Sequence, residues 1–410
     1  MNKALEFVLS KFKQQDGELL IGGIAISEIV NEHATPLYIY DKEILKWRHR
    51  ILRDALPKDL RIYYAVKANP NKEIIRELAS LYDGLDIASK GEMVKAIEAG
   101  VAPDKMSFAG PGKSIDELYF AIEKGIATIS VECEREIDHI KAICRDLQKE
   151  TKILIRVNPD FELSRSGMKM GGGPKQFGID SERVPETIRK LQGDEWIKFE
   201  GIHIFAGSQN LQAQAILEAF SKIFDYCQNL SAAIDVPLKT VNLGGGFGIP
   251  YFAHDSELDV ETVGKGLQKL LDDYRDHFIG TQFRIELGRY IVGECGLYVA
   301  KILYRKVSRG QVFLILDGGL HHHLAASGNF GQSVVRRPFP LTVVNRLNNP
   351  LEKVNVVGPL CTPLDTFGMQ VFMPKADEGD FVAVMTSGAY GFSASPLGFL
   401  SHQYPMEVII

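Results

Sequence analysis

The sequence predicts an α/β fold in which a (β/α)8 barrel is joined to a mostly β C-terminal domain. Between residues 61 and 289, apolar runs typical of buried strands alternate with amphipathic stretches typical of helices. Eight such units favour closure into a parallel barrel over an open, doubly wound sheet. After Arg289 the pattern changes to strands with few helices. We therefore expect a barrel domain over residues 42–290, and a β domain made of residues 1–41 and 291–410.

The elements follow from these patterns in chain order. The expected barrel strands are 61–66, 85–88, 106–109, 127–131, 152–157, 199–204, 240–243 and 283–287. Between them, the spacing of apolar residues predicts helices over Asn71–Tyr82 and over Lys90–Ala99, the second ended by Gly100. In the β domain we expect strands over 307–316, 341–344, 354–357 and 381–385, together with N-terminal strands 19–21 and 37–40.

The composition is that of an ordinary soluble globular protein. The chain has 410 residues, of which 45% are hydrophobic and 24% charged, with a net charge of −5, so nothing suggests nucleic-acid binding. We find no apolar stretch that could span a membrane and no apolar signal core at the N-terminus. The five cysteines are widely spaced and odd in number, which predicts reduced thiols in a cytoplasm and argues against a disulfide framework or a zinc site.

Lys67 is the most informative residue. It ends the apolar run Tyr63-Tyr64-Ala65-Val66 and precedes Ala68-Asn69-Pro70, so it follows the first barrel strand, where the active sites of such barrels lie. An amine at this position can form a Schiff base with an aldehyde cofactor. The alternative is a lysine that only extends to the surface.

Two further motifs follow the seventh and eighth strands. Gly244-Gly245-Gly246 lets backbone N–H groups approach a phosphate closely, at the usual phosphate site of this architecture. In Glu286-Leu287-Gly288-Arg289, the glutamate can pair with a protonated pyridine nitrogen and Arg289 can bind phosphate. A plain turn and a surface ion pair are the respective alternatives.

The sixth strand ends in the stretch from Gly201 to Gln209. Gly207 and Ser208 can offer an N–H and a hydroxyl to phosphate. His203 and Phe205 alternate on one face of the strand, toward the interior or mouth of the barrel. A histidine in this position is also compatible with a purely structural role in the core.

Three motifs of the β domain remain. Cys361 in Gly358-Pro359-Leu360-Cys361 and Tyr390 in Gly388-Ala389-Tyr390-Gly391 each follow an expected strand, and the pattern alone indicates turns with a buried thiol and a phenol. For His321-His322-His323 we predict no metal, because adjacent histidines cannot all face one ion.

Taken together and in this order, the motifs resemble the fold-type III pyridoxal phosphate decarboxylases, which include ornithine, arginine and diaminopimelate decarboxylases. The resemblance covers essentially the whole chain. It implies a carboxy-lyase that uses pyridoxal 5'-phosphate and removes the α-carboxylate of an amino acid. It also implies a homodimer in which Cys361 and Asp365 of one subunit contribute to the site of the other.

The resemblance also implies a role for each matching residue. Lys67 holds the cofactor as a Schiff base, Glu286 pairs with the pyridine nitrogen, and Cys361 or Lys67 returns the proton to the substrate carbon. Asp365 contacts the substrate, Asp86 and Glu92 support the lysine and the ring, and Arg156 lies behind them. The implied phosphate ligands are Ser208, Gly244, Gly245, Gly246, Gly288, Arg289 and Tyr390.

Two departures from the family pattern bear on the substrate. The usual histidine that stacks on the cofactor ring is replaced by Phe205, whose ring can still stack. The Glu-Ser-Gly that diaminopimelate decarboxylases carry after the cysteine is Thr362-Pro363-Leu364 here. The missing glutamate removes a partner for an amine at the far end of the substrate, which argues against diaminopimelate.

Other stretches resemble a narrower subgroup. Phe108–Lys113, Met168–Gly178 and Phe205–Asn210 look like segments of the exosortase-associated decarboxylases and of those that act on an amino acid tethered to an acyl-carrier protein. Lys113, Lys169 and Lys175 are therefore either solvated loop lysines or contacts for an acidic carrier protein.

Several functions stay open at this point. A free diamino acid such as diaminopimelate is the alternative substrate. Amino-acid racemisation is a second enzymatic alternative, although it needs a tyrosine as the opposing base where this chain has Cys361. A non-catalytic regulator that keeps the fold is the third, and the joint presence of Lys67, Glu286 and Cys361 argues against it.

Overall fold

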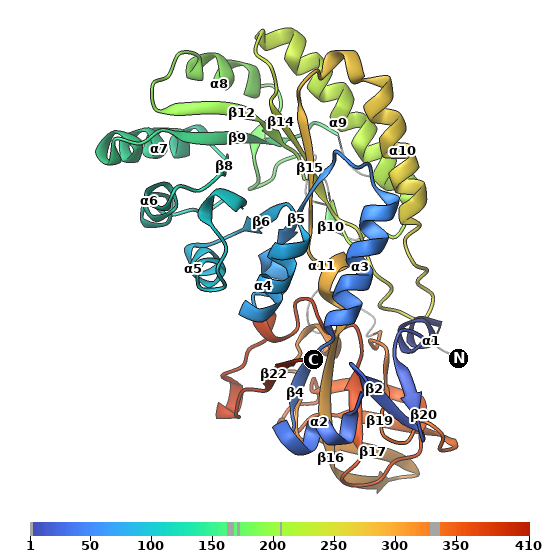
Figure 1. The fold of residues 1–410 in the computed structure, drawn as a ribbon. Helices are drawn as coiled ribbons and strands as arrows, with labels where there is room; N and C mark the ends of the chain where they lie inside the picture. The colour runs from blue at the N-terminus through green and yellow to red at the C-terminus, as the bar shows by residue number, and fades with distance from the viewer. Residues whose placement is uncertain (1–2, 162–167, 170–172, 206, 329–336) are drawn as a thin grey trace. The chain divides into compact units, whose positions relative to one another are not determined.

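The barrel is the larger of two compact units in the computed structural model, which describes residues 3–161, 168–169, 173–205, 207–328 and 337–410. This unit comprises residues 48–248 and 257–288. Its strands pair in parallel in the order β9-β12-β14-β15-β5-β6-β7-β8, and β8 pairs with β9, so the ring closes (Figure 1). The eight strands are β5 (Arg61–Ala65), β6 (Gly84–Ile87), β7 (Met106–Phe108), β8 (Thr128–Val131), β9 (Thr151–Asn158), β12 (Ile197–His203), β14 (Thr240–Gly245) and β15 (Gln282–Leu287). The predicted parallel eight-stranded barrel is confirmed.

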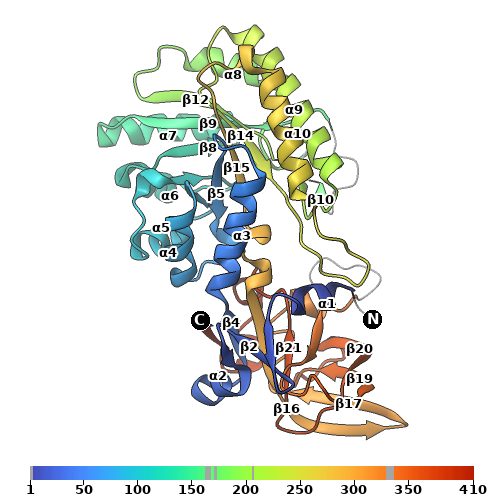
Figure 2. The same ribbon diagram turned by 45° about the vertical axis from the view of Figure 1, so that its right-hand side comes forward.

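Helices follow the strands and surround the ring, as Figures 1 and 2 show. They are α4 (Lys72–Leu81), α5 (Lys90–Glu98), α6 (Ile115–Lys124), α7 (Glu134–Leu147), α8 (Val184–Leu191), α9 (Ala213–Ile234) and α10 (Val260–Asp273). The starts of three of them follow from local sequence, because Asn71 caps α4, Ser89 caps α5, and Ser114 forms a capping box with Glu117 at α6. Each cap fixes the residue at which a helix begins. The polar side chains gather just before it, at the end of the preceding strand.

The second unit comprises residues 1–47, 249–256 and 289–410 and is mostly β. Its main sheet contains β4 (Leu37–Tyr40), β16 (Gly296–Ser308), β17 (Gln311–Leu316), β18 (Leu341–Val343), β19 (Leu351–Val357), β20 (Thr366–Pro374), β21 (Phe381–Val384) and β22 (Met406–Ile409). The N-terminal strand β4 pairs with β16 and β22. The prediction of a β domain completed by an N-terminal strand is therefore confirmed.

Shorter elements complete both units. The second unit also has α1 (Lys3–Leu9), β1 (Lys13–Gln15), β2 (Glu18–Ile21), β3 (Ile24–Ala25), α2 (Ile26–His33) and α11 (Arg289–Val292). The barrel unit has β10 (Met168–Lys169), β11 (Ile179–Asp180) and β13 (Gly207–Ser208), and α3 (Lys42–Ala55) leads into it.

One predicted strand is wrong. The chain over 307–316 is not one strand but a hairpin, in which β16 ends at Ser308 and β17 begins at Gln311. Arg309 and Gly310 make the turn with φ of 48° and 79°, a left-handed pair that suits a tight hairpin. The sequence carries a signal for this turn, because the polar run Ser308-Arg309-Gly310-Gln311 separates the apolar residues of the two strands.

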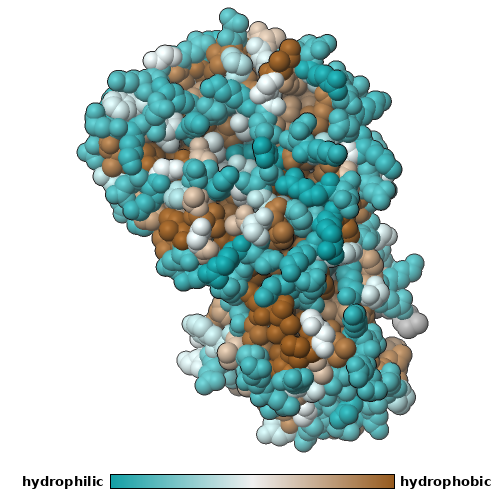
Figure 3. Space-filling view, in the orientation of Figure 1, coloured by the Kyte–Doolittle hydropathy of each residue, from teal (hydrophilic) through white to brown (hydrophobic). Residues whose placement is uncertain are grey.

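The surface in Figure 3 is mostly hydrophilic, with apolar side chains gathered in a few patches. Over the described ranges, no helix combines the length and the apolar character needed to cross a bilayer.

Candidate active site

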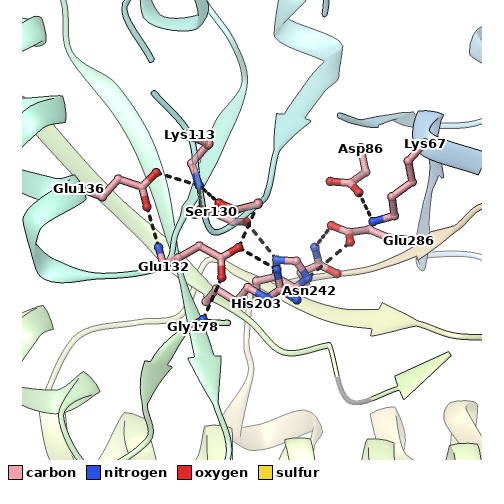
Figure 4. A network of polar contacts seen from close by, with 12 residues as sticks. Lys67, Asp86, Lys113, Ser130, Glu132, Glu136, Gly178, His203, Asn242 and Glu286 are labelled. Atoms are coloured by element: carbon pink, nitrogen blue, oxygen red, sulfur yellow. Dashed lines mark hydrogen bonds and ion pairs between the residues drawn. The ribbon is translucent and has the colours of Figure 1, made fainter. Parts of the chain in front are cut away.

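Lys67 lies at the carboxyl end of β5, in the short 3-10 turn Val66–Ala68. Its Nζ is 3.5 Å from Asp86 Oδ2 at the end of β6, and Figure 4 shows the two side chains pointing toward each other. Asp86 is only 1% exposed, and neither of its oxygens accepts a hydrogen bond from a described residue. Burial, followed by the nearby charge of Glu286, raises the pKa of Asp86 to about 8, against the opposing effect of Lys67.

Glu286 is buried at the end of β15 and has better partners than Asp86 (Figure 4). Asn242 Nδ2 donates a hydrogen bond to its Oε1, and His203 Nε2 lies 3.4 Å from its Oε2. Burial works to raise the pKa of Glu286, but the contact with His203 and the charges of Arg284 and Lys67 outweigh burial and lower that pKa. Of the two carboxyl groups, Glu286 is therefore the one that is ionised.

His203 links Glu286 to the next layer of polar groups. Its Nδ1 is 3.1 Å from Ser130 Oγ, at the end of β8. Burial is the main cause that lowers the pKa of His203, so the ring is neutral near pH 7. If the Ser130 hydroxyl donates to Nδ1, the proton of the imidazole lies on Nε2, which faces Glu286.

Phe205 follows His203 on the same face of the chain. The Nζ of Lys67 lies 5.9 Å from the centre of its ring. An aromatic ring is therefore near the lysine, where it can stack on a flat ligand.

The glycine loop, defined here as Gly244, Gly245 and Gly246 at the end of β14, is held by the same asparagine that contacts Glu286. Asn242 Oδ1 accepts a hydrogen bond of 3.0 Å from the N–H of Gly244. A Cβ on Gly245 would lie 1.9 Å from the carbonyl oxygen of Glu286, and one on Gly246 would lie 2.1 Å from that of Gly207. Gly244 and Gly246 also have φ of +67° and +92°, so glycine is needed here both for conformation and for space.

Lys113 departs from its prediction. Its side chain is 1% exposed, so it is neither a solvated loop lysine nor available to a carrier protein. Its Nζ forms an ion pair of 2.8 Å with Glu136 and donates to the carbonyl oxygens of Gly110 and Ser130 (Figure 4). The amine thus connects three segments of the chain, which are α7, β8 and the loop after β7. Lys175 is exposed, whereas the side chain of Lys169 lies outside the described residues.

Arg156 takes part in a buried contact, and Glu92 in an exposed one. Arg156 Nη1 donates to Glu132 Oε1 at 2.7 Å, and its guanidinium lies 4.8 Å from the centre of the Phe177 ring. Glu92 accepts a hydrogen bond of 2.7 Å from the N–H of Ala88 and so supports the loop that follows Asp86.

In the second unit, Arg289 and Tyr390 lie together. The guanidinium carbon of Arg289 is 4.7 Å from the centre of the Tyr390 ring, and its Nη1 donates to Tyr251 Oη at 2.9 Å. Arg289 Nε has no partner among the described residues, which leaves a donor for an anion. Tyr251 was not singled out in the sequence, because its contact to Arg289 joins segments far apart in the chain.

Cys361 and Asp365 differ sharply in environment. Cys361 is exposed in the connection between β19 and β20. Asp365 is 2% exposed, and its oxygens accept hydrogen bonds from the N–H groups of Leu320 at 2.6 Å and Leu360 at 2.8 Å. Its carboxylate therefore holds the loop that carries Cys361, and its contact with substrate stays a prediction.

The histidine run is buried, and two of its three side chains have hydrogen-bonding partners. His322 contacts Tyr298 Oη and the carbonyl oxygen of Gln403, and His323 contacts Ser387 Oγ. Across the described part of the chain, no group of three His, Cys, Asp or Glu side chains is arranged to hold a metal ion.

The barrel unit thus brings Lys67, Asp86, Glu286, His203 and the glycine loop to the carboxyl ends of its strands. Sequence reasoning missed Asn242 as the link between two of these motifs. The available signal was its position two residues before Gly244 on the same strand.

Comparisons with known proteins agree with this arrangement. The pyridoxal-binding domain of pyridoxal-dependent decarboxylases matches residues 42–293. An L-glutamyl-[BtrI acyl-carrier protein] decarboxylase from Niallia circulans is 36% identical over 389 residues, which are 94% of this chain and 90% of that protein. A diaminopimelate decarboxylase from Aquifex aeolicus is 30% identical over 93% of this chain and 88% of its own length. The solved diaminopimelate decarboxylase from M. jannaschi is similar with a TM-score of 0.90 at 25% identity, covering 98% of this chain and 93% of its own.

Proposed function

This chain belongs to the family of pyridoxal-dependent decarboxylases, and we propose that it acts on an amino acid whose far end is joined to a larger group, such as the thioester of an acyl-carrier protein. The reaction is the loss of the α-carboxylate as carbon dioxide. When bound, pyridoxal phosphate supplies the electron sink for the pair of electrons that carbon dioxide leaves behind.

The residues of the barrel unit fit this cofactor. Asp86 has two buried oxygens without a hydrogen-bond donor, beside an amine at 3.5 Å. Glu286 is a buried carboxylate held by Asn242 and His203. It can accept a hydrogen bond from the protonated ring nitrogen. The observation that carries the proposal is the placement of an amine beside one buried carboxyl group, Asp86, with a second buried carboxyl group, Glu286, held by Asn242 and His203 at a neighbouring strand end.

Each residue has a proposed task. Lys67 bonds the cofactor aldehyde, and Phe205 stacks on the ring. Gly244, Gly245, Gly246, Gly288 and Ser208 provide backbone N–H groups and a hydroxyl for the phosphate. We keep Arg289 and Tyr390 as further phosphate ligands. Cys361 returns the proton to the substrate carbon, and its exposure is compatible with a reaction at the site of a second subunit. A cytoplasmic homodimer is part of the proposal, and the free state of all five cysteines supports a reducing compartment.

Two observations favour a tethered substrate over a free diamino acid. The relative from Niallia circulans, whose name specifies a carrier-bound glutamyl group, is 36% identical, against 30% for the diaminopimelate decarboxylase. In addition, Thr362-Pro363-Leu364 offers no carboxylate for a distant amine. A free diamino acid remains the second candidate, because several relatives and solved neighbours act on diaminopimelate by name.

The test is release of carbon dioxide from a panel of free amino acids and of carrier-tethered aminoacyl thioesters. We expect turnover of a tethered substrate, and none by the Lys67→Ala variant. Turnover of free diamino acids alone would refute the tethered substrate and leave the decarboxylase intact. Change of configuration at the α-carbon without release of carbon dioxide would instead indicate a racemase.

A further inference from the structure

Arg284 is a charged residue in the interior of the barrel, where a charge is not expected. It lies on β15 two residues before Glu286, so both side chains leave the same face of the strand, about 7 Å apart along it. Arg284 is only 3% exposed. The interiors of such barrels are usually filled by layers of branched apolar side chains, so a guanidinium here calls for a physical reason.

The direct partners of Arg284 are all uncharged. Its Nη2 donates to Ser107 Oγ at 3.0 Å, the contact with Thr128 Oγ1 is 3.4 Å, and the guanidinium lies 4.8 Å from the centre of the Tyr63 ring. Gly84 leaves the space for this ring, because a Cβ there would lie 2.8 Å from two of its atoms. Arg284 Nε has no partner among the described residues. The pocket is thus shaped for the guanidinium but does not neutralise it.

A buried charge without a counter-charge is costly, and Glu286 is the carboxylate placed to offset it. The other titratable groups that face Glu286 are Lys67, Asp86 and His203. Glu92 in turn acts on Asp86, and Arg156 acts on His203. Lys67 is 44% exposed, so solvent screens its charge, and His203 is neutral near pH 7. Arg156 is paired with Glu132. Arg284 alone combines deep burial, permanent charge and the absence of an ion-pair partner among the described residues.

We propose that Arg284 is a positioning residue that acts through the barrel interior to keep Glu286 ionised where it meets the ring nitrogen of the cofactor. The inference rests on the proposed function. A carboxylate accepts a charge-assisted hydrogen bond from a protonated ring nitrogen, whereas a protonated Glu286 does not. The lowered pKa of Glu286, to which Arg284 contributes against burial, agrees with this role.

The test compares two cofactors on the apoprotein, pyridoxal phosphate and 1-deazapyridoxal phosphate, which has carbon in place of the ring nitrogen. Equilibrium binding is measured by absorbance for the wild type, Arg284→Met and Arg284→Lys. Binding is compared as the pH is lowered, because Arg284 matters only where Glu286 begins to take up a proton. We expect Arg284→Met to raise the pH at which pyridoxal phosphate binding is lost by about one unit, which is about a tenfold loss of affinity at acid pH, and to leave the deaza compound unchanged. Arg284→Lys keeps the charge and is expected to restore most of the difference.

Controls separate this role from a structural one. Arg48→Met removes another arginine of the same unit that is 1% exposed, and it should not change the ratio of the two affinities. In a Glu286→Gln background, Arg284→Met should have no further effect on that ratio. Equal weakening of both cofactors by Arg284→Met, or an unchanged ratio, would overturn the inference.

Two further results are decisive. If the wild type binds neither cofactor, the proposed function itself fails. If the wild type binds and Arg284→Met leaves the ratio of the two affinities unchanged, only the role of Arg284 fails. If Arg284→Met does not fold, the double variant with Glu286→Gln is expected to recover folding, measured by circular dichroism, because it removes both charges. A double variant that unfolds as readily would count against the coupling.

Discussion

Asn242 joins two parts of the site through the two ends of one amide. Its Nδ2 donates to Glu286, and its Oδ1 accepts from the N–H of Gly244. Asn242 thus holds both Glu286, the proposed partner of the ring nitrogen, and the glycine loop. Neither distance along the chain nor residue type predicts this double use, because it depends on the pairing of β14 with β15.

Asn242→Asp is expected to weaken pyridoxal phosphate binding at least about tenfold near pH 7, because a second carboxylate replaces the donor to Glu286. The loss should shrink at lower pH, where one of the two acids is protonated. Asn158→Asp, at the buried end of β9 in the same barrel, is the matched control and should leave binding near the wild-type value. A spectroscopic titration at several pH values measures both.

Asp86 gives the apoprotein a definite pH dependence. Its pKa is raised to about 8 by burial first and by Glu286 second, so between its ordinary pKa and 8 the folded state binds a proton that the unfolded state releases. Stability is therefore highest below that window and is lost as the pH rises toward 8, by at most about 1.4 kcal/mol per pH unit.

We expect the free energy of unfolding of the apoprotein, measured with urea, to fall from pH 6 to pH 8. Asp86→Asn, which cannot titrate, should flatten the curve over this range. A variant with the same slope as the wild type would show that Asp86 ionises normally.

Sequence reasoning found the residues that stand at strand ends but not their partners. Lys67 and Glu286 were singled out because charged groups end apolar runs. Lys113 was misjudged because its loop looks exposed, whereas Glu136 from α7 and the carbonyl oxygen of Ser130 enclose its amine. Burial of this kind follows from tertiary contacts that no local pattern contains.

At the scale of elements, the eight barrel strands could be predicted to within about two residues. Strands buried on both faces are continuous apolar runs, so each stood out between amphipathic helices. The β unit was harder. Strand β16 changes from buried to exposed along its length, the middle of β20 is not buried, and no residue of β22 is buried, so none of these strands is a continuous apolar run.

The glycine loop after β14 gives a prediction at this scale. Gly246→Ala is expected to weaken cofactor binding by about tenfold or more, because a Cβ would lie 2.1 Å from Gly207 O and a left-handed residue with a side chain costs roughly 1–2 kcal/mol. Gly280→Ala is the control, since Gly280 has φ of +79° but nothing within 4 Å. Equal effects of the two variants on binding would show that conformation matters and close approach does not.

At the scale of the whole molecule, the proposed homodimer predicts complementation. Lys67→Ala and Cys361→Ala should each be inactive alone if the two residues serve one site from different subunits. Mixing them, with exchange of subunits, should restore about a quarter of the wild-type activity, because half of the dimers then carry one intact site. A mixture as inactive as its parts would contradict a shared site. The predicted domain limits at residues 42 and 290 likewise stay a prediction.

The account depends above all on Lys67 as the residue that bonds the cofactor. The direct measurement is borohydride reduction of the cofactor-loaded protein, followed by mass spectrometry of its peptides. We predict one pyridoxyl group, on the peptide that contains Lys67, and loss of the bound cofactor's absorbance band in Lys67→Ala. Labelling of a different lysine in the wild type, or undiminished labelling of Lys67→Ala, would contradict the account.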